Sequence, residues 1–189
     1  YEVPLFSFCR YLSNGEFVTG VEPFGKRDAM DFWRPETLRI LGSSEKWGTG
    51  MHFLTTLPRA LPPGPAVVQW AYPQYRTEDA LYATSGIQAL SGGLTQKLVA
   101  EKVYDQPLRC FPWWEADKVV KVAKPENANV LSAVYATNGK AIVFVSNFDR
   151  EGEREVTIEL DPAALFPGRK VSGIQWRDLD PGLEPPKVA

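Results

Sequence analysis

The clearest alternation of apolar and polar positions lies after residue 110, where the pattern is that of β-structure. Residues 130–136 and 141–148 are two apolar runs rich in β-branched and aromatic side chains, and Asn138-Gly139 lies between them. Asn-Gly between two such runs predicts a β-hairpin, because both residues tolerate a positive φ.

Further strands are predicted on either side of this hairpin. Residues 154–160 alternate between apolar and polar side chains, which is typical of a strand with one buried face. Asp161 followed by proline predicts one helical turn over residues 161–165, with the aspartate as its N-cap. Residues 118–123 and 171–176 have the composition of two more strands. Strands at this spacing, separated by turn signals, predict an antiparallel β-sandwich.

The first part of the chain predicts helices mixed with short extended segments. Residues 35–41 begin with proline and are followed by glycine, as in a short helix. Residues 77–90 predict a longer helix, with acidic side chains in its first turn and Gly92-Gly93 after its end. A third helix is predicted over residues 96–104.

Two short apolar runs, residues 51–57 and 66–71, predict buried parallel strands. Strands followed by helices in this order are typical of the closing units of an α/β barrel, although a complete barrel needs about 250 residues. We therefore expect an α+β protein in two parts. Residues 1–109 form a partial, barrel-like α/β region, and residues 110–189 form the antiparallel β-sandwich.

Composition and charge narrow the classes of function. The 21 Lys and Arg against 23 Asp and Glu give a net charge of −2, so the basic face typical of nucleic-acid binding is not expected. No apolar run approaches the ~20 residues that cross a bilayer, so no membrane partner is expected. No glycine-rich phosphate loop is present, and we expect no cofactor. The cellular compartment stays open.

The two cysteines and the single histidine allow few kinds of site. Cys9 and Cys110 can form one disulfide that closes a long loop, or they are two separate buried thiols. With one histidine, His52, and no Cys-x-x-Cys, no zinc site of the usual spacing is expected.

Two carboxylates are the candidate catalytic groups. Glu22 follows an apolar stretch, at a point where a barrel strand would end, and Asp31 lies a little further along the chain. Glycoside hydrolysis needs a pair of carboxyl groups, one acting as acid and the other as base or nucleophile. The alternative is that both are solvated turn residues, as acidic side chains in glycine-rich loops usually are.

Aromatic residues make up 12% of the chain, and several lie in segments that contain proline. Flat aromatic faces pack against the C–H face of a sugar ring, and tryptophan and tyrosine add a polar tip. Histidine can add a hydrogen bond or act as a base, although it can equally be an ordinary core or surface residue. The candidates for a sugar subsite are Trp33, His52, Trp70 and Tyr72. Trp113 and Trp114 are better interpreted as anchors of an interface between the two parts.

Three segments carry a family resemblance: Cys-Phe-Pro-Trp-Trp-Glu at 110–115, Ile-Val-Phe-Val-Ser-Asn-Phe at 142–148 and Val-Thr-Ile-Glu-Leu-Asp at 156–161. Together they resemble the join between the catalytic barrel and the C-terminal β-sandwich of large bacterial glycoside-hydrolase-like proteins. Residues 20–24 are faintly similar to the last barrel units. In such proteins the strands that usually carry the catalytic acids precede a region like this one.

The resemblance implies a C-terminal portion of a carbohydrate-active protein, with a carbohydrate and the N-terminal portion of the same protein as its partners. From charge and composition, no nucleic-acid or membrane partner is expected. The alternative is a non-catalytic module that uses its aromatic residues to bind a carbohydrate or a protein. A small hydrolase that uses His52 is a weaker interpretation, because no nucleophile elbow accompanies the histidine.

Overall fold

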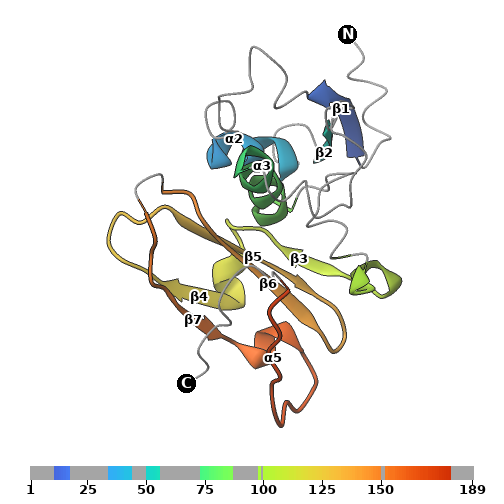
Figure 1. The fold of residues 1–189 in the computed structure, drawn as a ribbon. Coiled ribbons are helices and arrows are strands. Elements are labelled where there is room, and N and C mark those ends of the chain that lie inside the picture. Colours follow the sequence, from blue (N-terminus) through green and yellow to red (C-terminus); the bar gives the residue numbers. More distant parts are fainter. Residues whose placement is uncertain are drawn as a thin grey trace.

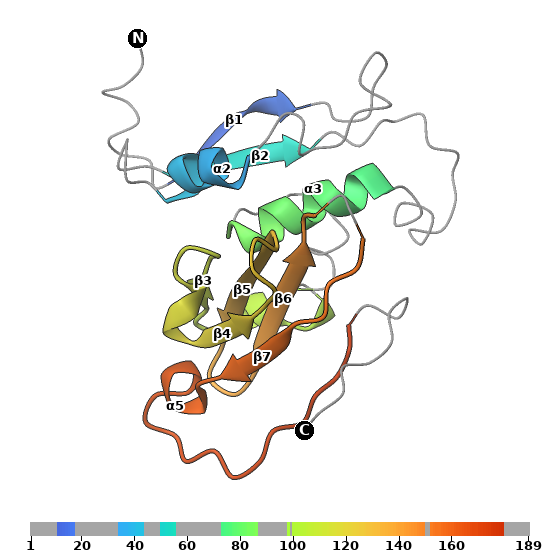
Figure 2. The same cartoon turned by 90° about the vertical axis from the view of Figure 1, so that its left-hand side faces the viewer.

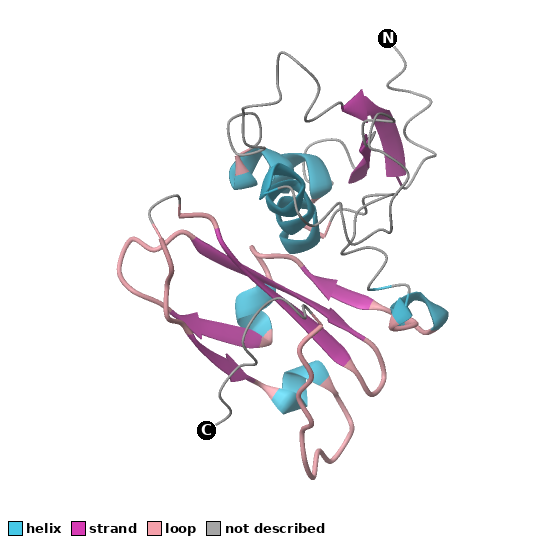
Figure 3. Cartoon of the chain, in the orientation of Figure 1, coloured by secondary structure: helices cyan, strands magenta, loops and turns pink. Residues whose placement is uncertain are grey.

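A computed structural model shows a mixed α+β protein with a few short helices, two antiparallel sheets and one parallel strand pair (Figures 1 and 3). The structure describes residues 11–17, 34–43, 50–55, 73–86, 98, 100–149 and 152–179. Within these residues no sheet closes into a barrel. None of the helices described is long and apolar enough to span a membrane.

The larger antiparallel sheet has the strand order β3-β5-β6, with β3 at Arg109–Phe111, β5 at Val130–Ala136 and β6 at Ala141–Asn147. The predicted hairpin is confirmed, and Ala136 pairs with Ala141 at its closed end.

The turn of this hairpin has a different geometry from the one predicted. Neither Asn138 nor Gly139 has φ in the left-handed region. Four residues separate the paired strands, and the backbone N–H of Thr137 donates to the carbonyl of Lys140 at 2.8 Å. The Thr137 hydroxyl bonds the same carbonyl at 3.2 Å. This longer loop reverses the chain without positive φ angles, so the two residues mark the turn but do not set its type.

The smaller antiparallel sheet pairs β4, Val120–Ala123, with β7, Thr157–Leu160. Both strands are predicted by the sequence, although each is shorter than expected. Residues 116–118 instead form a 3-10 turn before β4. The alternation in β7 is confirmed, because its two apolar side chains are half-buried and its two polar side chains are exposed.

The strand predicted over residues 171–176 is wrong. None of these residues forms a strand, and only Val171 is partly buried. Gly173 interrupts the segment, and its neighbours Ser172 and Ile174 are exposed. Glycine weakens a strand interior because it has no side chain to pack. The segment therefore has β-forming residues, but none of their side chains is fully buried and it forms no strand.

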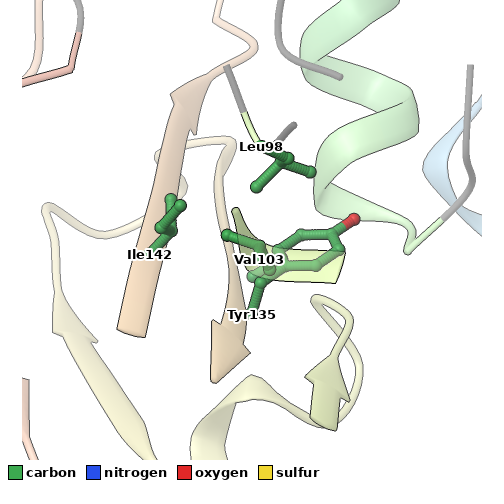
Figure 4. Packing of buried hydrophobic residues seen from close by; sticks show 5 residues of the cluster. Leu98, Val103, Tyr135 and Ile142 are labelled. Carbon is green, nitrogen blue, oxygen red and sulfur yellow. The ribbon is translucent and has the colours of Figure 1, made fainter. Parts of the chain in front are cut away.

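Strand β5 supplies both hydrophobic cores of this part of the molecule, because its side chains point alternately to the two faces of the sheet. On one face, the inter-sheet core joins the two sheets and the short helix α5, Pro162–Leu165. Its buried members are Val119, Val120, Val134, Ala136 and Leu165. On the other face lies the helix-side core, shown in Figure 4. Its buried members are Leu98, Val103, Ala133, Tyr135 and Ile142.

Helix α5 is positioned from both ends. The Asp161 carboxylate accepts hydrogen bonds from the N–H groups of Ala163 and Ala164 at 2.9 and 3.1 Å, which confirms the predicted N-cap. At the other end, the Arg109 guanidinium donates to the carbonyls of Ala164 and Leu165. Strand β3 is thereby tied to α5, the last helix that the structure describes.

Upstream, β1 at Tyr11–Phe17 and β2 at Gly50–Thr55 form a parallel pair. Helix α2, Pro35–Gly42, lies between them in the chain and begins at proline as predicted. The parallel strand expected at 51–57 is confirmed at β2, whereas the one expected at 66–71 lies outside the described residues. The sequence pattern did not predict β1.

Helix α3, Pro73–Thr84, lies between the parallel pair and the sheet β3-β5-β6 (Figures 1 and 2). It begins and ends earlier than the predicted helix at 77–90. Gly86, with φ of +67°, follows its last turn, so this glycine and not the pair at 92–93 marks the end. The helix predicted at 96–104 is interrupted, because Lys102 adopts a left-handed φ of 55° before a 3-10 turn at Val103–Asp105.

Gly86→Ala is expected to lower the free energy of unfolding by about 1–2 kcal/mol, because an L side chain is strained at this φ. The added Cβ also meets the Cys110 sulfur at 3.2 Å. Gly168, at φ +77°, has no atom within 4 Å of such a Cβ, so Gly168→Ala is a matched control with strain alone. Urea unfolding measures both variants.

The excess cost of Gly86→Ala over Gly168→Ala is expected to shrink when Cys110→Ala is combined with it, because the crowding atom is then removed. Equal costs at the two glycines, or no recovery in the double variant, contradict a close packing of Gly86 against Cys110.

Candidate functional site

Five of the six candidate residues fall in two connections, each of which runs from a strand to the next helix that the structure describes. Phe17 and Thr55, the last residues of β1 and β2, are register partners, so both strands end at the same edge of the parallel pair. The first connection, residues 18–34, leads from β1 to α2, and the second, residues 56–72, leads from β2 to α3. Glu22, Asp31 and Trp33 belong by chain position to the first connection, and Trp70 and Tyr72 to the second.

These five residues lie outside the described part of the structure. The described elements nevertheless mark where their connections begin and end. Trp33 directly precedes Arg34, the N-cap residue of α2, and Tyr72 directly precedes Pro73, the first residue of α3.

His52 is the one candidate that belongs to a described element. It lies within β2, where its backbone pairs with Ser13 of β1, three positions before the strand ends at Thr55. The histidine is therefore part of the strand and does not belong to either connection, which separates it along the chain from the other candidates.

The last turn of α3 is fixed to the antiparallel sheet by two hydrogen bonds. The Tyr135 hydroxyl donates to the Ala83 carbonyl at 2.9 Å, and Tyr135 projects from β5 toward the helix (Figure 4). The backbone N–H of Trp113 donates to the Thr84 carbonyl at 2.8 Å. Carbonyls in the last turn of a helix have no partner within the helix, and here strand and loop supply the donors.

Trp113 and Trp114 lie at this junction, in the segment that follows β3. Their rings meet edge to face, with centroids 5.6 Å apart and an interplanar angle of 86°. Both residues are half-buried. Their position beside α3 fits the interpretation as interface anchors better than a sugar-binding role, because a stacking surface needs an exposed ring face.

Two polar atoms of the junction are buried without a hydrogen-bond partner among the described residues. They are the Ser85 hydroxyl and the indole N–H of Trp113. No pattern in the sequence signals this feature, because it depends on how α3 meets the segment after β3. Buried polar atoms without partners are uncommon, so this junction is unusual in having two polar groups whose hydrogen-bonding capacity is not used by any described residue.

Cys110 is a free thiol in this structure, and Cys9 lies outside the described residues, so the choice between a disulfide and two separate buried thiols stays open. The residue as a whole is exposed, but loss of water around its thiol raises the pKa to about 11, and the hydrogen bond with Tyr135 opposes this only in part. Burial likewise raises the pKa of Tyr135 well above its usual value. Both groups are therefore protonated at neutral pH, and neither is an activated nucleophile.

No metal centre is found in the described part of the chain, where no group of three His, Cys, Asp or Glu side chains could hold an ion. No protein-family model, curated protein or solved structure matches the chain. The candidate site is therefore defined by chain order and fold alone.

Tyr135→Phe is expected to lower the free energy of unfolding by about 1–2 kcal/mol, because it removes a buried hydrogen bond and retains the ring. Thr157→Val, which deletes an exposed hydroxyl from β7, serves as a control with little expected change. Chemical denaturation compares the two variants. Equal stability of Tyr135→Phe and the parent chain contradicts a stabilising role for the bond to α3.

Cys110 is expected to react with iodoacetamide about 100-fold more slowly at pH 8 than an ordinary thiol, because a pKa two units higher leaves about 100-fold less thiolate. The rate rises with pH toward about 11, where half of the thiol ionises. Peptide mapping by mass spectrometry separates Cys110 from Cys9. A half-maximal rate near pH 8.5 contradicts the desolvated thiol.

Proposed function

We propose that this chain is the C-terminal portion of a carbohydrate-active, glycoside-hydrolase-like protein. It contributes aromatic loops that contact the sugar and an accessory antiparallel β-sandwich. The observation that carries the proposal is the chain order. Five of the six candidate residues occur in the two connections that run from a parallel strand to a helix.

In α/β barrels, catalytic and binding residues lie in the loops that follow the carboxyl ends of the strands. The parallel pair β1-β2, with α2 between the strands and α3 after them, has the element order of two such units. A fragment of a barrel, completed by segments upstream of it, fits this order.

The proposed chemistry uses the first connection for acid–base catalysis. Glu22 is the proposed general acid and Asp31 its partner, because hydrolysis of a glycosidic bond needs one protonated and one ionised carboxyl group. Trp33 and the second connection, with Trp70 and Tyr72, provide flat faces for the sugar. His52 is the weakest member of this proposal, since its backbone position is within a strand.

The sandwich has an orienting role in this proposal. Helix α3 follows the second connection directly, and its last turn is bonded to β5 and to the segment after β3. A sheet that holds the end of α3 also restrains the end of the connection that precedes it. Loops positioned by a rigid scaffold are the usual place for binding residues.

Glu22→Gln is expected to lower the glycosidase activity of the complete protein by at least about 100-fold, the size of a lost general acid. Glu159→Gln removes an exposed carboxylate from β7 and is the matched control, with activity unchanged. Both variants are assayed on a panel of aryl glycosides and oligosaccharides. Full activity of Glu22→Gln would rule out the assigned acid.

The second candidate function is a binding module without catalysis, and the exposed Trp176 of the sandwich favours it. Isothermal titration of the chain against the same oligosaccharides discriminates between the two. Binding with no turnover by the complete protein supports the module, whereas turnover lost in Glu22→Gln supports the hydrolase.

A further inference from the structure

The segment after α5, residues 169–178, leaves large apolar side chains in solvent. Ile174 and Trp176 have exposed fractions of 46% and 43%. In the described part of the chain, Ile40 is the one other large apolar residue as exposed as these. Single exposed apolar side chains are ordinary, but two within three positions form a local patch, and such patches mark interaction sites.

This segment is fixed at both of its ends. The backbone N–H of Arg169 donates to the Phe166 carbonyl at 3.1 Å. At the other end, the Arg177 guanidinium forms an ion pair with Glu101 at 2.5 Å, and Leu179 packs against the helix-side core. The exposed side chains between these anchors therefore belong to a preformed surface, which costs less conformational entropy on binding than a loose tail.

The surroundings of the patch carry an excess of positive charge. The Glu101 carboxylate is shared by Arg177 and by Lys140, whose ammonium lies 2.8 Å away. The hydrogen bond from Lys140 holds the pKa of Glu101 below its usual value, so the carboxylate stays ionised and neutralises one of the two cations. Arg169 and Lys170 are exposed and add two more positive charges, whereas the exposed Asp178 adds a negative one. These four cations against two carboxylates leave a local excess of two positive charges, in a chain whose net charge is −2.

We propose that residues 169–177, together with Lys140, bind an acidic glycan, that is, an oligosaccharide that contains uronic acid. This inference rests on the proposed carbohydrate function and names a substrate class for it. The indole of Trp176 packs against the C–H face of one sugar ring. The exposed cations form charge-assisted hydrogen bonds with the sugar carboxylates.

An acidic glycan accounts for both features of the surface. A neutral sugar uses the tryptophan but offers no carboxylate to the exposed cations. A small inorganic anion uses the cations and leaves the exposed Trp176 and Ile174 uncovered. Nucleic acid also combines flat rings with negative charge, but it is usually bound by a more extended basic face than this one.

The test is isothermal titration of the full chain with oligogalacturonate, a neutral cello-oligosaccharide of equal length and single-stranded DNA. We expect oligogalacturonate to bind more tightly than the other two, and its affinity to fall as salt increases. Trp176→Ala is expected to weaken binding by about 10-fold, the effect of losing one central contact, and Trp176→Phe to retain most of the affinity. The Trp176 side chain is exposed, so neither substitution is expected to unfold the protein.

Lys170→Gln is expected to lower the affinity for oligogalacturonate about 2- to 5-fold and to weaken its salt dependence. Lys121→Gln, which removes an exposed cation from β4, is the matched control with unchanged affinity. Equal binding of neutral and acidic oligosaccharides, tighter binding of DNA, absence of binding, or an unaffected Trp176→Ala each overturns the proposal. None of these outcomes bears on the loss of hydrolysis in Glu22→Gln, so the two proposals can fail separately.

Discussion

A hydroxyl buried in an apolar core is costly unless it has an acceptor, and this constraint positions α3 on the antiparallel sheet. Tyr135 places its ring among the apolar side chains of the helix-side core, and its hydroxyl reaches the Ala83 carbonyl at the end of α3. A shift of α3 along the sheet would leave both the hydroxyl and the carbonyl without this partner. Because unpaired polar groups are costly in a core, the position of the helix on the sheet is specific.

Tyr135 lies on β5, and the opposite face of this strand packs against the smaller antiparallel sheet. Val134 and Ala136 face β4, β7 and α5, whereas Ala133 and Tyr135 face the helix side. A strand buried on both faces cannot slip by one residue without moving each set of side chains into the wrong core. The register of the hairpin and the docking of α3 are thus set by one seven-residue segment.

Some elements could be predicted from local sequence patterns, because their own alternation of apolar and polar residues or their own capping residue determines them. The hairpin strands, β4, β7, the capped turn at α5 and the start of α2 follow from alternation, from Asp161 and from Pro35. The end of α3 was not predictable in this way, because Gly86 stops the helix where it also packs against Cys110. The segment 171–176 has the composition of a strand but pairs with no described strand. Local composition does not indicate whether a pairing partner is available.

In the candidate site, too, some features could be predicted from local patterns and others depend on contacts between distant residues. Chain order places its carboxylates and aromatic residues between strand and helix, since strand and helix signals are local. The junction around Tyr135, Trp113 and Ser85 depends on contacts between residues far apart in sequence. For example, nothing near Cys110 in the chain indicates that a tyrosine from β5 and a glycine after α3 lie against it.

The bonds from Arg109 to the end of α5 have a consequence for the order of folding. They join residues 55 and 56 positions apart, so these bonds to β3 cannot form until the chain has reached Leu165. Contacts of such separation form late, because the entropy of closing the loop is lost before the contact is gained. During synthesis, the hairpin leaves the ribosome before α5 and β7, with Val134 and Ala136 still uncovered. This interval is when the nascent chain is most exposed to aggregation.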